Sequence, residues 1–320
     1  MRRGGRSQCA GGRAVWRIEF PGHPTDHRRD AARKESCRGE VQEEMMKAEQ
    51  AVAGHYGKSG LEEKILGALA RAGIDAKNMT ATDLAPVDEF HVGGIDATKE
   101  LAAQMELRKG MGLLDVGCGI GGPARFFAGD YGCKVTGIDL TEEFIQVATT
   151  LTRMVKLDAA AEFRQGSALK LPFEATTFDG AYMIHVGMNI ADKTAVFREV
   201  RRVLKSGALF TVFDIMRASD AAIAYPVPWA ASGETSFVET VAAYGSALQN
   251  ARFRAQRQRD RREFGIQFAE RNLARMAEGG PPALGLHLLM GDKAPLMAKN
   301  ILAMMHQGAL TPVEILARAI

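Results

Sequence analysis

Apolar and polar residues follow regular periods from about residue 48 onward, and the first of these periods predicts helices. Residues 60–73 place apolar side chains at helical spacing and end in a glycine, which is typical of a helix and its carboxyl end. A second helix is predicted over residues 96–110. We therefore expect a helical N-terminal lid over residues 46–100.

Short apolar segments then alternate with amphipathic segments. The apolar segments predict strands over residues 112–117, 133–139, 161–166, 178–184 and 208–215, and the amphipathic segments predict helices over residues 121–129, 141–155 and 192–204. Strands that alternate with helices at this length favour an α/β fold with a parallel sheet covered on both faces. We assign residues 101–216 to this core.

The alternation stops after Met216. A turn-rich segment leads to helices predicted over residues 237–250, 264–278 and 293–306, with strands over residues 252–260 and 312–320. We assign residues 217–311 to a cap or substrate region and residues 312–320 to a final core strand.

Composition narrows the classes of protein that fit. The chain has 320 residues, of which 46% are hydrophobic and 25% charged, and its net charge is +3. Residues 1–44 hold 10 basic and 7 acidic residues, which leaves 31 of each in residues 45–320. The balanced charge predicts no nucleic-acid-binding surface, and the lack of a long apolar run predicts no membrane span.

Residues 1–45 differ from the rest, because they are rich in Arg and Gly and lack apolar periodicity. We expect a disordered tail or a non-native leader that precedes a start at Met45 or Met46. The four cysteines of the chain have spacings that fit neither a zinc site nor a disulfide framework, which favours a reduced, cytoplasmic protein.

A glycine-rich segment follows the first predicted core strand. Its pattern Gly117-x-Gly119-x-x-Gly122 matches a dinucleotide fingerprint, so an NAD(P)-dependent oxidoreductase is one candidate. Asp115 disfavours a dinucleotide ligand, because its carboxylate would repel the pyrophosphate. Asp139 ends the next strand, where a carboxylate suits two ribose hydroxyls of either NAD or S-adenosylmethionine.

Four segments together discriminate between these ligands. The strings "LLDVGCGIGG", "VTGIDLTEEF", "LPFEATTFDGAYM" and "FREVRRVLKSGALF" resemble the class I S-adenosylmethionine-dependent methyltransferases. The chain is also similar to their small-molecule branch, which includes sarcosine/dimethylglycine, phosphoethanolamine and quinone/tocopherol methyltransferases. The resemblance implies a Rossmann-like, doubly wound, mostly parallel seven-stranded sheet, with the helical N-terminal lid and a helical insertion before the last strand.

The resemblance also implies residues that bind the cofactor, S-adenosyl-L-methionine. Asp115, Gly117 and Gly119 would lie along its methionine part, with Asp115 near the amino group. Asp139 would hold the ribose, and Leu140 would pack on the adenine.

A further contact with the adenine is implied for the segment "GSA", which contains Ser167 and Ala168. Most members of the family have an acidic residue where this chain has Ser167. A hydroxyl can accept the same hydrogen bond, but without the assistance of a charge.

Ligands of open α/β sheets bind at the carboxyl ends of the strands. His185, Met188 and Asn189 follow one predicted strand and Asp214 ends another, so all four are candidates to contact the substrate. For Asp214 the alternative is to accept backbone amides of a loop, and for His185 it is a structural hydrogen bond.

The predicted lid contributes two further candidates. In "DEFHVGG", His91 could fold over the cofactor, and Tyr56 in "GHYG" could close on the methyl donor. His185 and His91 are the candidate catalytic bases, because imidazole titrates near neutral pH. Plain packing is the alternative for Tyr56, as a structural role is for His91.

The predicted function is methyl transfer from S-adenosylmethionine to a small-molecule acceptor by in-line displacement. An amine is the first candidate acceptor, with carbon methylation of a quinone-like ring or S-methylation as alternatives. An oxidoreductase or a catalytically silent cofactor-binding protein is the alternative of a different class. We expect no metal, because the sequence has no carboxylate cluster, and the oligomeric state stays open. The arginine run "RFRAQRQRDRR" is interpreted as a solvated strand edge.

Overall fold

The computed structural model describes residues 43, 46–57, 60–280 and 282–320. The prediction of a tail or leader over residues 1–45 therefore falls almost wholly outside them. The chain divides into two units, Met1–Ala48 and Glu49–Ile320. The sheet and the helices that cover it belong to the second unit.

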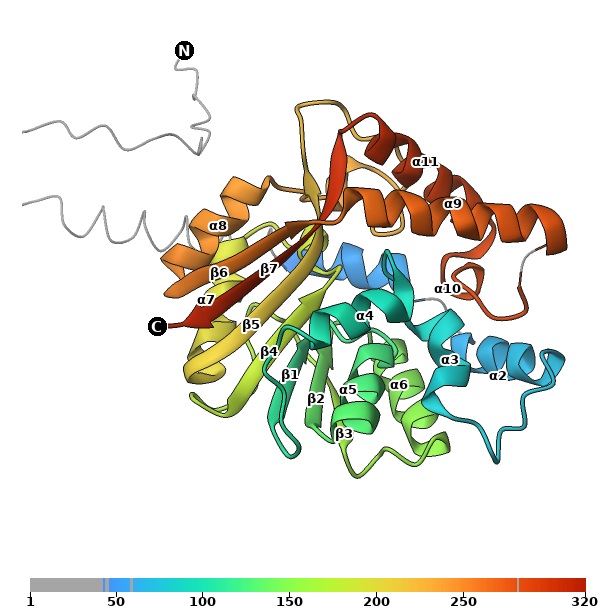
Figure 1. Cartoon of the computed structure of the whole chain (residues 1–320), viewed down its shortest axis with the longest axis horizontal. Helices are drawn as coiled ribbons and strands as arrows, with labels where there is room; N and C mark the ends of the chain where they lie inside the picture. The colour runs from blue at the N-terminus through green and yellow to red at the C-terminus, as the bar shows by residue number, and fades with distance from the viewer. Residues whose placement is uncertain (1–42, 44–45, 58–59, 281) are drawn as a thin grey trace, which may run out of the picture. The chain divides into compact units, whose positions relative to one another are not determined.

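Seven strands form one sheet in the order β3-β2-β1-β4-β5-β7-β6 (Figure 1). Their bounds are β1 Gly112–Val116, β2 Lys134–Asp139, β3 Ala161–Gln165, β4 Phe178–Ile184, β5 Leu204–Arg217, β6 Phe253–Asp260 and β7 Leu310–Ala319. The first five strands pair in parallel, and β7 lies antiparallel between β5 and β6. This topology confirms the predicted doubly wound, mostly parallel seven-stranded sheet.

Helices cover both faces of the sheet. Their bounds are α2 Leu61–Arg71, α3 Ala81–Asp88, α4 Gly94–Ala102, α5 Gly122–Tyr131, α6 Glu142–Met154, α7 Lys193–Val203, α8 Val241–Asn250, α9 Arg262–Gly279, α10 His287–Met290 and α11 Ala294–His306. Short 3-10 helices are η1 Gly187–Asn189, η2 Gly233–Thr235 and η3 Gly291–Lys293. In Figure 1, α4, α5 and α6 lie on one face of the sheet, and α7 and α8 lie on the other.

The alternation of side chains along each strand explains why both faces need helices. On β1, Leu113 packs in the apolar cluster that includes α4 and α5, while Leu114 and Val116 pack in the cluster that includes α7 and α8. Successive side chains of a strand point to opposite faces, so a strand that is apolar on both faces must be covered twice.

The helix predicted over residues 96–110 is shorter than expected. It ends at Ala102, and the chain then turns, with Glu106 at a positive φ of 52°. The apolar period continues past the point where this turn redirects the backbone, so the prediction of its end was wrong.

The helix predicted over residues 237–250 starts later than expected, at Val241. The Thr240 side chain caps its first turn by accepting from the Ala243 amide at 3.1 Å. A threonine at this position satisfies an amide that has no partner within the helix, so capping sets the start.

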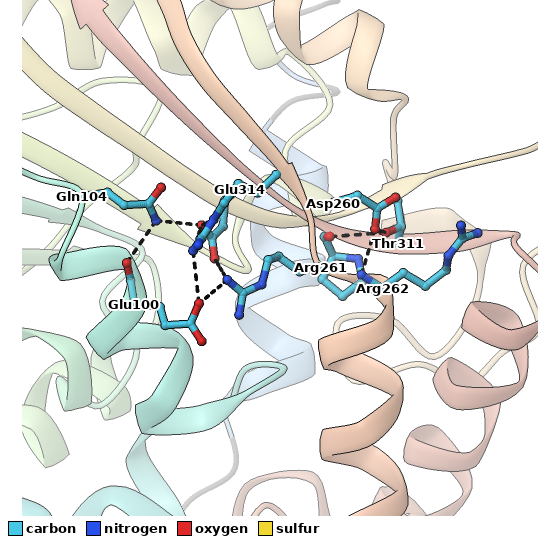
Figure 2. Close-up of polar contacts among 9 residues, drawn as sticks. Glu100, Gln104, Asp260, Arg261, Arg262, Thr311 and Glu314 are labelled. Atoms are coloured by element: carbon cyan, nitrogen blue, oxygen red, sulfur yellow. Dashed lines mark hydrogen bonds and ion pairs between the residues drawn. The ribbon is translucent and has the colours of Figure 1, made fainter.

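The arginine run lies largely on β6, the edge strand, as predicted, but part of it is not solvated. Arg261 is buried and pairs with Glu100 of α4 and with Glu314 of β7, the latter at 3.1 Å. Glu314 also accepts from Arg259 at 2.8 Å and from Gln104 at 2.9 Å. Figure 2 shows how these contacts connect α4 to the edge of the sheet.

Helices α9 and α11 lie side by side and pack on β7 (Figure 1). The four methionines of α10 and α11 are buried in two apolar clusters and belong to the core: Met290, Met297, Met304 and Met305. Within the described part of the chain, no helix is long and apolar enough to span a membrane.

Candidate active site

The loop between β1 and α5 has bare backbone where a side chain would not fit. Gly117 has a φ of 75°, and a Cβ built on it would lie 2.4 Å from Val186 Cγ2. A Cβ on Gly119 would lie 2.7 Å from Phe90 Cζ. Because L-residues rarely adopt such φ values and both positions are crowded, only glycine fits here.

Asp115 lies just before this loop and is buried. The Tyr182 hydroxyl donates a hydrogen bond to Asp115 Oδ2 at 3.1 Å. Burial raises the pKa of the Asp115 carboxyl to about 8, and the negative charge of Asp139 adds to the shift. No cation of the described residues offsets it, so the site favours either a proton or a positively charged ligand.

Asp139 ends β2 and holds two backbone amides. Its Oδ2 accepts from the Gly119 amide at 3.0 Å, and its Oδ1 accepts from the Thr141 amide at 2.9 Å. The carboxylate therefore fixes the glycine loop to the start of α6. Each oxygen keeps a second lone pair, so the same group can still accept from a ligand hydroxyl.

The end of β3 lies beside the end of β2, because Asp139 pairs with Gln165 in register. Leu140 and Ala168 are both half-buried. The sequence-predicted cofactor residues thus come from three neighbouring strand ends, those of β1, β2 and β3.

Ser167 occupies the position at which the resemblance to class I methyltransferases leads us to expect an acidic residue. Its hydroxyl oxygen accepts from the Leu169 amide at 3.0 Å, and its proton is donated to the carboxylate of Glu49. An acidic group is therefore present beside Ser167, although it comes from a distant part of the chain.

The segment between α3 and α4 lies against the glycine loop through Phe90. Just before it, Asp88 forms a buried ion pair with Arg125 of α5, with 2.7 Å between Asp88 Oδ2 and Arg125 Nη2. Glu89 accepts from the Thr98 hydroxyl at 2.7 Å, and burial raises the pKa of the Glu89 carboxyl well above its usual range. These two buried contacts hold the segment in place.

His91 and His185 lie next to each other. Their ring centroids are 5.8 Å apart, and the Phe213 ring lies 4.9 Å from His185 and 6.1 Å from His91. Burial lowers the pKa of His91 to about 4 and that of His185 well below its usual range. Both imidazoles are therefore neutral near pH 7, and the buried Nε2 of His185 has no hydrogen-bond partner among the residues that the structure describes.

Tyr56 and Asn189 connect the N-terminal helical residues to the loop after β4. The Tyr56 hydroxyl donates to Asn189 Oδ1 at 3.1 Å, while Asn189 Nδ2 donates to the carbonyls of Trp229 at 2.8 Å and Thr235 at 3.3 Å. Burial raises the pKa of the Tyr56 hydroxyl, so the phenol keeps its proton as the donor. Three segments that are distant in sequence meet at Asn189.

Met188 and Asp214 are more deeply buried than the other candidate substrate residues, His185, Asn189 and Tyr56. Met188 is buried in an apolar cluster with Trp229. Asp214 is fully buried and accepts from the Tyr244 hydroxyl at 2.7 Å, and burial raises the pKa of the Asp214 carboxyl to about 7. Asp214 also packs closely on Gly187 in the loop after β4, where a built Cβ would lie 2.3 Å from Asp214 Oδ2, which fits the alternative that Asp214 supports a loop.

The sequence did not point to four residues of this region, namely Glu49, Asp88, Phe90 and Arg125. Arg125 lies 37 residues from Asp88, and Glu49 lies 118 residues from Ser167, so neither contact leaves a local pattern. Within the described ranges, no group of three or more His, Cys, Asp or Glu side chains is placed to hold a metal ion.

Comparison with known proteins gives the class to which this site belongs. Residues 114–212 match the family model described as a methyltransferase domain. A sterol 24-C-methyltransferase of Gibberella zeae is 37% identical over 114 residues, which are 36% of this chain and 30% of that protein. A phosphoethanolamine N-methyltransferase of Triticum aestivum is 32% identical over 186 residues, which are 57% of this chain and 35% of that protein.

A solved structure has the same fold. Phosphoethanolamine N-methyltransferase 2 of Haemonchus contortus, in complex with phosphomonomethylethanolamine and S-adenosylhomocysteine, matches with a TM-score of 0.64 at 17% identity, over 79% of this chain and 59% of that chain. Residues 114–212 are therefore a methyltransferase domain, and the sheet has the Rossmann-like fold of the class I methyltransferases. Within that class the chain resembles enzymes named for small molecules, and it spans about a third of the length of the curated relatives it matches.

Proposed function

We propose that the chain transfers the methyl group of S-adenosylmethionine to a small-molecule acceptor. One observation carries this proposal: Asp115, the bare loop at Gly117 and Gly119, and Asp139 form a continuous row at the ends of β1 and β2. The row offers a carboxylate without a cation, then bare backbone, then a second carboxylate. The cofactor presents an ammonium group, a sulfonium chain and a ribose in the same order.

The residues present fit that cofactor. An ammonium group beside Asp115 would supply the positive charge that this buried carboxylate lacks, and its binding would favour the ionised form. Asp139 would accept from the ribose hydroxyls with its remaining lone pairs. S-adenosylmethionine, when bound, supplies an activated methyl group on a sulfonium.

The contribution of the chain to catalysis would be to position the acceptor against the methyl group and to exclude water from the site. In-line displacement needs the reacting atoms about 3–3.5 Å apart, and a closed site holds that geometry. Tyr56 and Asn189 join the N-terminal helical residues to the loop after β4, and Phe90 covers the glycine loop. These contacts would restrict the acceptor to one approach.

An amine is the first candidate for the acceptor. The Triticum aestivum relative, which aligns over 186 residues, is named for transfer to nitrogen. A methylated alkylamine keeps a pKa of about 10, so a histidine with a pKa of about 4 would not remove its proton. An amine that arrives unprotonated needs no base, and the chain would then act by positioning alone.

A carbon acceptor is the second candidate, and the two histidines favour it. Methyl transfer to carbon leaves a strongly acidic C–H that must lose its proton, and a weak neutral base can take it. His91 and His185 are such bases.

Transfer of an isotope-labelled methyl group to a metabolite extract, followed by mass spectrometry, tests the proposal and names the acceptor atom. A labelled product supports the proposed function. Tight binding of S-adenosylhomocysteine without any labelled product, across extracts from several sources, would favour a silent binding protein instead.

The variant His185→Gln then tests whether this histidine acts as a base on the identified acceptor. A carbon acceptor predicts a fall in kcat of about a hundredfold or more, because the proton would lose its base, whereas an amine acceptor predicts an unchanged kcat. Steady-state kinetics on the identified substrate measure the difference. The exposed residue His306, changed to Gln, is the matched control.

A further inference from the structure

Helical residues 49–56 lie over the ends of the strands and are fastened at both ends. Glu49 contacts Ser167 after β3, and Tyr56 contacts Asn189 after β4. In the order of the sheet, β2 and β1 lie between these two strands. The helical residues therefore bridge the two strand ends that carry the proposed cofactor carboxylates.

Given the proposed function, the order of the strands also sets the direction in which a bound cofactor lies across their carboxyl ends. Its methionine part belongs at Asp115 on β1 and its ribose at Asp139 on β2. The base must then continue in the same direction, toward the end of β3. Ser167 lies there, two positions beyond Gln165, which is the partner of Asp139 in the sheet.

The acceptor at this position is Glu49 rather than Ser167. The exocyclic amine of adenine is a donor and needs an acceptor. Ser167 gives its proton to Glu49 and already accepts from the Leu169 amide. Glu49 is a half-buried carboxylate that meets Ser167 through Oε1, which leaves Oε2 for a ligand and makes it the stronger, charged acceptor.

We propose that Glu49 selects adenine: its carboxylate accepts from the exocyclic amine of the cofactor, and Ser167 orients that carboxylate. The inference rests on the proposed function and deepens it. It gives the N-terminal helical residues a role in recognition as well as in covering the site. An acidic group would thus reach the base from outside the sheet.

Isothermal titration with two ligands tests the inference. S-adenosylhomocysteine carries the exocyclic amine, and S-inosylhomocysteine carries a carbonyl in its place. We expect the wild-type protein to prefer the adenine ligand by about tenfold or more, because a carbonyl would face a carboxylate. Glu49→Gln should lose that preference, because an amide can pair with either group. Glu63→Gln, at an exposed acid of α2, is the matched control.

A double variant separates recognition from a structural effect. Glu49→Ala should lose the preference, and the addition of Ser167→Asp should restore it by returning a carboxylate to the end of β3. Thermal melts show that each variant is folded. Equal wild-type affinity for both ligands, or a preference retained in Glu49→Gln, would overturn the inference and leave the proposed function intact. Failure of the wild-type protein to bind either ligand would overturn both.

Discussion

Gly117 shows how strongly the glycine loop depends on one backbone position. Gly117→Ala would hold an alanine at a φ of 75° with its Cβ 2.4 Å from Val186 Cγ2. We expect a loss of about 2–4 kcal/mol in the free energy of unfolding, because strain at positive φ and overpacking add. Urea denaturation measures this loss.

Gly73 provides the control for that substitution. It has a similar φ of 72°, but a Cβ there would meet nothing within 4 Å. Gly73→Ala should therefore cost only the backbone strain, about 1–2 kcal/mol. Equal losses for the two variants would show that crowding by Val186 does not matter.

Single residues differ in how far the sequence could reveal them. Asp115, Gly117 and Asp139 could be predicted because glycine spacing and strand ends are local features. The structure brings these residues together at the carboxyl ends of β1 and β2. Glu49 could not be predicted, because its partner Ser167 lies 118 residues away and a glutamate in an amphipathic helix is ordinarily a solvated residue.

Arg125 joins three helices around the site. It lies in α5, donates to Asp88 of α3 at 2.7 Å, and donates to Thr152 of α6 at 2.8 Å. Arg125→Met should lower the free energy of unfolding by about 3–5 kcal/mol, because Asp88 would stay buried without its partner. Chemical denaturation measures this loss.

An exposed ion pair is the control for Arg125. Arg164 pairs with Glu162 on the surface of β3. Arg164→Met should leave the stability nearly unchanged, since water screens such pairs. A comparable loss in both variants would contradict the role of the buried pair.

Elements were easier to predict than their ends. The pattern of apolar positions and turn residues identified all seven strands, because both signals are local. The ends of the helices near residues 102 and 241 were missed, since a turn at Glu106 and a cap at Thr240 override the apolar period. The fastening of α4 to Arg261 could not be seen either, because it joins segments 161 residues apart.

Buried carboxyls make the stability of the whole molecule depend on pH. Burial raises the pKa of Asp115 to about 8 and that of Asp214 to about 7, both above the unfolded value. Between the unfolded and folded pKa values the native state binds more protons, so stability falls as pH rises. His91, with its pKa lowered to about 4, acts in the opposite direction, but only between about pH 4 and 6.5.

The ligand-free protein should therefore lose stability between about pH 6.5 and pH 7.5. We expect a fall of about 1–2 kcal/mol in the free energy of unfolding, because Asp115 and Asp214 keep protons in the native state that they have lost in the unfolded state. Urea denaturation at the two pH values measures it. Asp115→Asn should remove the larger part of the fall, and Asp130→Asn, at an exposed site on α5, should leave it unchanged. A stability that rises over this window would contradict the assignment.

The central claim is that this site binds S-adenosylmethionine rather than a dinucleotide. The most direct measurement is therefore the binding of S-adenosylhomocysteine by isothermal titration, with NAD as the competing candidate. We predict binding of S-adenosylhomocysteine alone, with Asp139→Ala weakening it by about 1.5–3 kcal/mol through the loss of charged hydrogen bonds. Asp130→Ala, at the exposed site, should bind as the wild-type protein does. Binding of NAD without S-adenosylhomocysteine, or an unchanged dissociation constant in Asp139→Ala, would contradict the proposed cofactor site.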